Sequence, residues 1–145
     1  MVKPTTQELE FINSCRVGRL ATVDEERRPH LIPVCYVFSG GIFYTPIDNK
    51  PKRAKPSRLK RMRNISANPN VAVVIDRWSE DWERLGYVFV SGRADIISTG
   101  GEYRRSLGLL EAKYPQYERM NLGGLGLPVI KIVPDRLVSW GALGG

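Results

Sequence analysis

Residues 18–45 read GRLATVDEERRPHLIPVCYVFSGGIFYT, and this stretch decides the fold. Residues 18–23, 30–38 and 42–45 are rich in the β-branched and aromatic side chains that favour strands. A polar run separates the first two segments, and a Ser-Gly-Gly turn separates the last two. Because connections this short leave no room for a parallel crossover, the stretch predicts three consecutive antiparallel strands.

Pro33 lies inside the second of these strands. Proline has no N–H to donate to a strand ladder, so it is expected on an edge strand or at a bulge. The backbone around Pro33 is then free to meet a ligand.

Helices are predicted at three places. Thr5 and Glu8 have capping-box spacing and predict a short amphipathic helix. Ser57 is expected to cap a second helix. Thr99 and Glu102 have the same spacing as the first pair and predict a third. The apolar face of this third helix carries Tyr103, Leu107, Leu110 and Tyr114.

Further strands follow the second helix. Residues 71–76 form a continuous apolar run, typical of a buried central strand. Residues 87–97 indicate a longer strand that bends at Gly92. Two closing strands, with a Pro-Asp turn between them, are predicted at residues 129–133 and 137–140.

The whole pattern predicts a mainly β protein, with a six- to seven-stranded antiparallel barrel that is closed or nearly closed and carries a few helices. At 145 residues and 42% hydrophobic content, residues 1–145 are expected to form one domain. No segment approaches the roughly 20 apolar residues of a membrane helix, and the N-terminus has no secretion-signal core. A cytoplasmic location is therefore expected.

The net charge of +7 is concentrated in one segment. Of the 22 basic residues, the 14 outside this segment are balanced by all 15 acidic residues. A concentrated patch favours one anionic ligand, whereas a nucleic-acid-binding protein usually spreads its basic residues over a face. The eight basic residues of segment 50–63 are Lys50, Lys52, Arg53, Lys55, Arg58, Lys60, Arg61 and Arg63.

The sequence lacks the usual catalytic and metal-binding sets. Its one histidine, His30, and two cysteines, Cys15 and Cys35, cannot complete a four-ligand zinc site. We interpret the cysteines as small buried hydrophobic residues. There is no Gly-x-Ser-x-Gly elbow and no Walker loop. If the chain is an enzyme, a cofactor must supply the reactivity.

The third predicted strand leads directly into the basic segment. Thr45 presents a hydroxyl at the strand end, and Lys50 and Lys52 supply ammonium groups. The start of the helix near Ser57 adds unpaired N–H donors and the positive end of the helix dipole. These groups predict a phosphate socket. The alternative is a solvated basic helix face without a ligand.

Several motifs resemble those of a known family. They are Gly18-Arg19-Leu20-Ala21-Thr22-Val23, Arg28-Pro29-His30-Leu31-Ile32-Pro33-Val34, Phe43-Tyr44-Thr45 and Asn64-Ile65-x-x-Asn68-Pro69-x-Val71. In this order and spacing they resemble the split-barrel flavin-binding proteins related to pyridoxamine 5′-phosphate oxidase. A further motif, Asp81-Trp82-x-Arg84-Leu85, is similar to a subgroup of deazaflavin-dependent oxidoreductases.

The resemblance implies a cofactor site on the early strands. The implied cofactor is the deazaflavin coenzyme F420 or FMN. Its ring would lie along the backbone of His30, Leu31, Ile32, Pro33 and Val34. Its phosphate would be held by Tyr44, Thr45, Lys50 and Lys52, with Lys60 and Arg61 as a second option for the cations.

The resemblance also implies a homodimer with the cofactor at the subunit interface. Such an interface would give Trp78, Trp82 and Trp140 a burial site, and ordinary core or edge packing is the alternative for each. The chain lacks the Arg-Leu-x-Pro tail of the oxidase proper. Oxidation of vitamin B6 is therefore not expected.

The expected function is hydride transfer between a bound flavin or deazaflavin and a small organic substrate, with the protein supplying positioning and electrostatics. No side chain is nominated as a catalytic acid or base. One alternative is a carrier or sensor that binds flavin, deazaflavin or haem without turnover. A third, less favoured, is nucleic-acid binding through residues 50–63.

Overall fold

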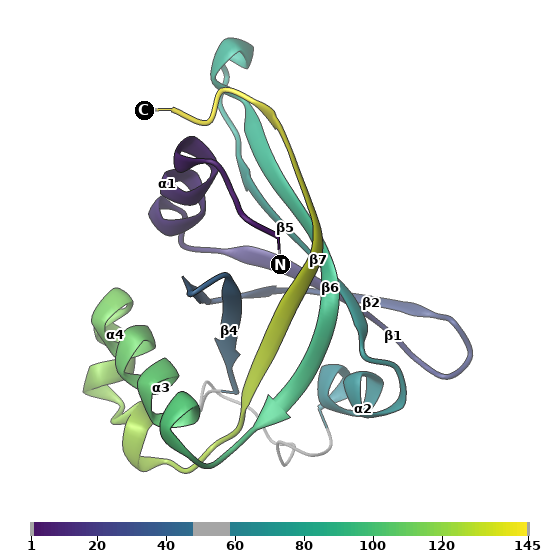
Figure 1. Cartoon of the computed structure of the whole chain (residues 1–145), viewed down its shortest axis with the longest axis vertical. Coiled ribbons are helices and arrows are strands. Elements are labelled where there is room, and N and C mark those ends of the chain that lie inside the picture. Colours follow the sequence, from purple (N-terminus) through teal and green to yellow (C-terminus); the bar gives the residue numbers. More distant parts are fainter. Residues whose placement is uncertain (1, 48–58, 145) are drawn as a thin grey trace.

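The computed structural model describes residues 2–47 and 59–144, and a seven-stranded antiparallel sheet dominates them. The sheet curls into a half-barrel (Figure 1), which confirms the predicted mainly β split-barrel architecture. Its strands are hydrogen-bonded in the order β2-β1-β5-β6-β7-β4-β3. They are β1 (Gly18–Val23), β2 (Pro29–Val34), β3 (Val37–Ser39), β4 (Ile42–Pro46), β5 (Asn70–Arg77), β6 (Gly86–Ile97) and β7 (Val129–Gly141).

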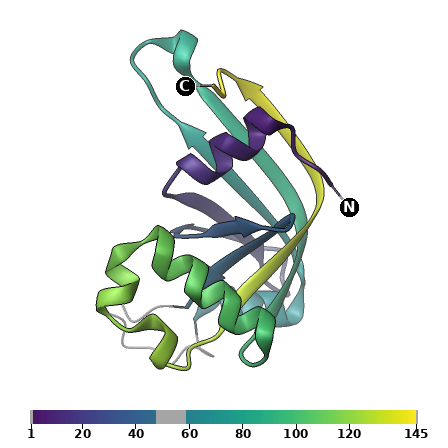
Figure 2. The same cartoon turned by 60° about the vertical axis from the view of Figure 1, so that its left-hand side comes forward.

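The described residues also form four α-helices: α1 (Thr6–Ser14), α2 (Lys60–Ala67), α3 (Gly101–Lys113) and α4 (Pro115–Arg119). Figures 1 and 2 show α1 on the concave side of the half-barrel, α3 and α4 as a layer beside β4, and α2 against the β1–β2 hairpin. Within residues 2–47 and 59–144, none of these helices is long and apolar enough to cross a membrane.

Apolar side chains form two clusters, because successive strand residues point to opposite faces of the sheet. The larger cluster fills the half-barrel, and its members include Phe11, Leu20, Phe43, Ile75, Val90 and Ile130. The smaller one lies under α3 and includes Val37, Tyr44, Leu107, Leu110 and Val129. Cys15 packs against the first cluster and Cys35 against the second, both half-buried.

The predicted continuous strand over residues 30–38 is wrong. Residues 29–34 form β2 at one edge of the sheet, whereas residues 37–39 form β3 at the other. The break occurs at Tyr36, whose backbone N–H and C=O both bond the Tyr114 hydroxyl, at 3.0 and 2.9 Å. Because a side chain satisfies these backbone groups, the chain leaves one ladder here and enters another.

The predicted turn between two closing strands is also wrong, because β7 runs unbroken from Val129 to Gly141. Gly92 pairs with Pro134, and Ser91 pairs with Arg136, so Asp135 is the extra residue of a bulge. The bulge accommodates the proline without ending the strand. The register shift lies opposite Gly92, the position at which the sequence predicted an irregularity in β6.

One of the three predicted helix caps is confirmed. Thr5 and Glu8 form the complete capping box of α1. Helix α2 begins at Lys60 with Leu59 at its N-cap, so the cap expected at Ser57 is wrong. Helix α3 has Gly100 at its N-cap, with a φ of 95°, in place of the expected Thr99. At a positive φ glycine carries no steric penalty, and this conformation turns the chain sharply into the helix.

Candidate functional site

Strand β2 forms an edge of the sheet and pairs only with β1 in the part of the chain that the structure describes. Pro33 therefore lies on an edge strand, as predicted. His30, Ile32 and Val34 are half-buried, whereas Leu31 is 65% exposed. Because an edge strand leaves one row of N–H and C=O groups outside the ladder, β2 can offer backbone groups to a ligand.

The first turn of α2 lies close to His30. His30 faces Thr22 across the β1–β2 pair, and Asn64 of α2 donates a 2.9 Å hydrogen bond to the buried Thr22 hydroxyl. This bond holds α2 against the hairpin. Burial lowers the pKa of His30, and the charges of Lys60 and Arg61 lower it further. The three basic side chains therefore share one local environment.

Asp24, in the β1–β2 turn, positions Lys60. Its carboxylate accepts hydrogen bonds from the backbone N–H groups of Arg28 and Glu26 and pairs with the Lys60 amine at 3.2 Å. These donors, the Arg28 N–H foremost, hold the pKa of Asp24 well below its usual range. Sequence reasoning missed this role, although an aspartate that opens a tight turn is a recognisable signal.

Thr45 ends up buried at the end of β4, with 1% of its surface exposed. Its hydroxyl has no hydrogen-bond partner among the described residues, and neither does Nδ1 of His30. Leaving a buried polar atom unpaired costs about 1–3 kcal/mol, which a bound polar ligand can offset. In Figure 1 the end of β4 and the start of α2 both lie toward the lower end of the half-barrel.

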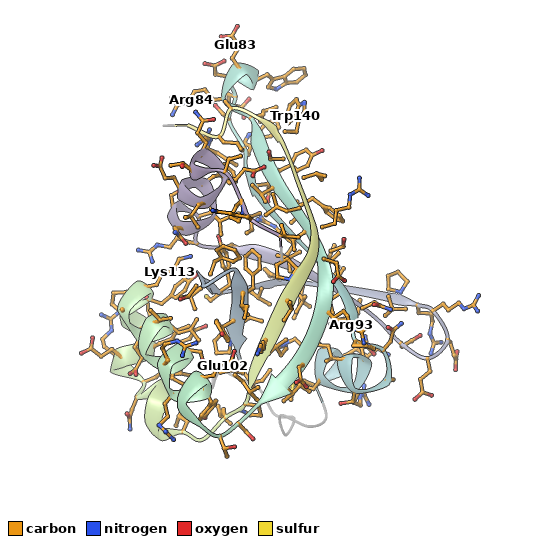
Figure 3. The ribbon with its side chains drawn as sticks, viewed as in Figure 1. Glu83, Arg84, Arg93, Glu102, Lys113 and Trp140 are labelled. Carbon is orange, nitrogen blue, oxygen red and sulfur yellow. The ribbon has the colours of Figure 1, made fainter. Side chains whose placement is uncertain are left out.

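Tyr44 points to the opposite face of the sheet from Thr45, because strand side chains alternate. Its hydroxyl donates to Glu102 at 2.6 Å, and Lys131 donates to the same carboxylate at 3.0 Å. The two bonds connect β4 to α3 and β7. Glu102, which accepts both, is labelled in Figure 3. Burial, and then the bond to Glu102, raises the pKa of Tyr44 to about 12. The sequence indicated Glu102 only as a capping residue.

Apart from Thr45 and the rest of β2, the predicted site residues fall into three groups. His30, Lys60 and Arg61 come together between β2 and α2. Tyr44 lies on the other face of its strand, within the network under α3. Lys50 and Lys52 lie outside the described residues, so their contact with a phosphate stays a prediction.

Three tryptophans lie at the far end of the β5–β6 hairpin and β7. We call these tryptophans, together with Tyr87, the aromatic tip. Trp78, Trp82 and Trp140 are 64%, 72% and 54% exposed, so none packs in the core of this chain. Trp140 stacks on Tyr87, with ring centroids 5.8 Å apart. Figure 3 shows Trp140 near Glu83 and Arg84, away from α2.

Comparison of the sequence with known proteins gives two results. A family model described as pyridoxamine 5′-phosphate oxidase matches residues 5–140. A curated relative is 30% identical over 144 residues, which cover 97% of this chain and 84% of the relative. This relative is the 5a,11a-dehydrotetracycline/5a,11a-dehydrooxytetracycline reductase of Streptomyces rimosus subsp. rimosus.

Solved structures share the fold at lower sequence identity. A conserved hypothetical protein from Mycobacterium tuberculosis is 20% identical, with a TM-score of 0.78, over 97% of this chain and 86% of that protein. The heme storage protein HutZ from Vibrio cholerae is 17% identical, with a TM-score of 0.73, over 92% and 93% of the two chains. At these identities the matches establish the architecture alone.

Proposed function

The chain belongs to the pyridoxamine 5′-phosphate oxidase family, and from this premise we propose that it is an oxidoreductase that transfers hydride between a bound flavin-type cofactor and a small organic substrate. The cofactor is FMN or the deazaflavin F420. The curated reductase relative supports the reaction class.

The convergence of His30 with Lys60 and Arg61 carries the proposal. Positive charge beside the exposed edge of β2 suits a ligand that joins an anionic phosphate to a flat ring. The first turn of α2 contains no acidic residue and has no side-chain cap, so its N–H groups add to the positive potential.

The residues present fit such a cofactor. Lys60 and Arg61 would hold the phosphate, and the free backbone groups of β2 would fix the ring. The buried Thr45 hydroxyl would gain a partner. When bound, the cofactor supplies the hydride acceptor and donor. The protein contributes orientation and the exclusion of water from one face of the ring.

Titration of the purified protein with FMN and with F420, followed by fluorescence, tests binding. We expect a Kd well below the millimolar range for at least one of them. Lys60→Gln and Arg61→Gln should each weaken binding at least tenfold, with partial recovery in Arg61→Lys. Arg63→Gln is the matched control, because Arg63 is exposed on the same helix. Failure of both cofactors to bind would reject the proposal.

His30 gives a second, independent test, because it is the only histidine in the chain. Its ring protons therefore report one pKa by NMR. A phosphate placed against Lys60 and Arg61 would screen the charges that lower this pKa, so cofactor binding should raise it. A His30 pKa that is unchanged when the cofactor is saturating would place the phosphate elsewhere.

Turnover separates an enzyme from a carrier. The probe is 5a,11a-dehydrotetracycline, the compound that names the relative, supplied with the reduced form of whichever cofactor binds. Oxidation of that cofactor, dependent on both protein and probe, supports the reaction. Tight binding without turnover of this probe or of other conjugated organic acceptors would favour the carrier alternative.

We also propose that the protein is a homodimer, with the aromatic tip in or beside the interface. Three tryptophans more than half exposed leave an apolar surface that association would bury.

A further inference from the structure

Two neighbouring cavities lie outside the proposed cofactor site. A cavity of about 530 Å³ lies between the N-terminal segment, α1 and the β3–β4 hairpin. A second, of about 330 Å³, lies between α1, β3 and α3. Asn13 and Phe38 line both, so the two cavities are neighbours on either side of these residues, and together we call them the α1–α3 groove. Other lining side chains are Leu9 in the first part, and Leu109, Ala112 and Lys113 in the second.

Lys113 stands at one end of this groove with a buried amine. Its Nζ has no hydrogen-bond partner among residues 2–47 and 59–144. The amine lies 3.9 Å from the centroid of the Tyr36 ring and 5.3 Å from that of Tyr114. Figure 3 shows Lys113 between α1 and the α3–α4 layer. A cation held on aromatic faces alone lacks the anion that a buried charge normally requires.

Within the described residues, the charged and titratable groups that act on Lys113 do not supply that anion. They are Arg16, Cys15, Cys35, Tyr36 and Tyr114. Burial raises the pKa of the Cys15 thiol and of both tyrosines, which keeps these groups neutral at pH 7. Arg16 is itself a cation, and its guanidinium donates to the Lys113 carbonyl oxygen. Burial, and then Arg16, lowers the pKa of Lys113 to about 8.

We propose that the α1–α3 groove binds a small monocarboxylate with an apolar chain, its carboxylate paired with the Lys113 amine and its chain running past Phe38 toward Leu9. The charge is complementary, and a carboxylate carries the single negative charge that one ammonium can match. A phosphate dianion would need further donors, and Arg16 is already engaged. The volumes suit a ligand of this size, since such sites usually span about 300–1,000 Å³.

Calorimetric titration with octanoate tests the proposal. We expect saturable binding that strengthens severalfold with each added methylene from butyrate to octanoate, because each buries apolar surface. Octanol, which has the chain without the charge, should bind at least tenfold more weakly. Octyl phosphate binding as tightly as octanoate would overturn the choice of a carboxylate.

Substitutions test whether the Lys113 amine is the group that pairs with the carboxylate. Lys113→Met should weaken octanoate binding at least tenfold, whereas Lys113→Arg should retain most of it. The matched control is Lys3→Met, because Lys3 lines the other end of the groove and is exposed. Loss of binding in Lys3→Met but not in Lys113→Met would overturn the proposal. FMN and F420 titrations of the same variants should be unchanged, which separates this site from the proposed cofactor site.

Proton uptake in the wild-type protein provides a test that needs no variant. Because the pKa of Lys113 is lowered to about 8, part of the Lys113 population is neutral at pH 8, and pairing with a carboxylate raises the pKa of this amine. Octanoate binding at pH 8 should therefore take up a fraction of a proton, seen as a heat that changes with the ionisation enthalpy of the buffer. Binding with no proton uptake at this pH would place the carboxylate away from Lys113.

Discussion

At the scale of single residues, the structure departs most from expectation where polar groups are buried. Lys113 carries a charge in an aromatic site, His30 shares its surroundings with two cations, and Tyr44 is tied to Glu102. Each of these environments affects either the free energy of unfolding or the pKa of a side chain, and both can be measured.

Lys113→Met should stabilise the ligand-free protein at pH 7 by about 1–2 kcal/mol, because it replaces a poorly solvated ammonium with an apolar chain of similar length. The pKa of Lys113 is lower in the folded state, so the unfolded state binds more protons between about pH 8 and 10.5. The stability of the wild type therefore rises across this window, and the advantage of the variant should narrow. Urea denaturation at pH 7 and pH 10 measures both effects, and a variant less stable at pH 7 would contradict the prediction.

Lys60→Gln should raise the pKa of His30 in the cofactor-free protein, because it removes one of the two charges that lower it. Proton NMR of the single histidine measures this change directly. Arg63→Gln should leave the His30 pKa nearly constant. Equal shifts in both variants would mean that the effect is a general response to net charge.

Tyr44→Phe should lower the free energy of unfolding by about 1–3 kcal/mol, since it deletes the 2.6 Å bond and leaves a Glu102 oxygen with one donor fewer. Tyr87→Phe is the matched control, because Tyr87 is 38% exposed and keeps its ring contact with Trp140. Chemical denaturation compares the two. A loss no greater than that of the control would show that the Tyr44 network does not contribute to stability.

At the scale of elements, the pairing of β6 with β7 organises the sheet. These strands are its longest, and the bulge opposite Ser91 and Gly92 lets β7 pass through Pro134 without a break. A side chain at Gly92 would overlap the Val133 backbone, so only glycine allows the two strands to approach this closely.

Gly92→Ala should therefore destabilise the protein by more than about 2 kcal/mol, because backbone on both strands must shift. Gly108→Ala, in the exposed interior of α3 with open space around it, should stabilise the protein by up to about 1 kcal/mol. Thermal and urea unfolding of both variants provide the comparison. Similar effects of the two substitutions would refute the close approach at the bulge.

At the scale of the whole molecule, the half-barrel leaves two features at its surface, the edge of β2 and the aromatic tip. The edge of β2 is the proposed binding site of the cofactor, and the aromatic tip is the proposed contact with a second copy of the chain. Figure 3 places Trp140 at the end of the sheet remote from α2, so the two surfaces can be tested separately.

Trp140→Ser combined with Trp82→Ser should shift the protein from dimer toward monomer, because both substitutions remove exposed apolar surface from the tip. Sedimentation velocity across a dilution series measures the change, and Val17→Ser is the control for loss of an exposed apolar side chain elsewhere, because Val17 is 39% exposed. A wild-type protein that is monomeric at all concentrations would reject the dimer.

The sequence by itself determined the strand content, the edge position of Pro33, the central position of residues 71–76 and the irregularity at Gly92. These features follow from local causes, namely the alternation of side chains, the missing proline N–H and the lack of a glycine Cβ. The basic segment also directed attention to Lys60 and Arg61, which lie near His30, while their contact with a phosphate stays a prediction.

Only the tertiary structure decided which elements meet. Tyr36 leaves its strand because Tyr114, 78 residues later, satisfies its backbone, and this sends β2 and β3 to opposite edges. Lys113 belongs to a groove because α1 and β3 pack beside α3. Such contacts join residues distant in the chain, and their energies depend on burial and partners that no local pattern of residues encodes.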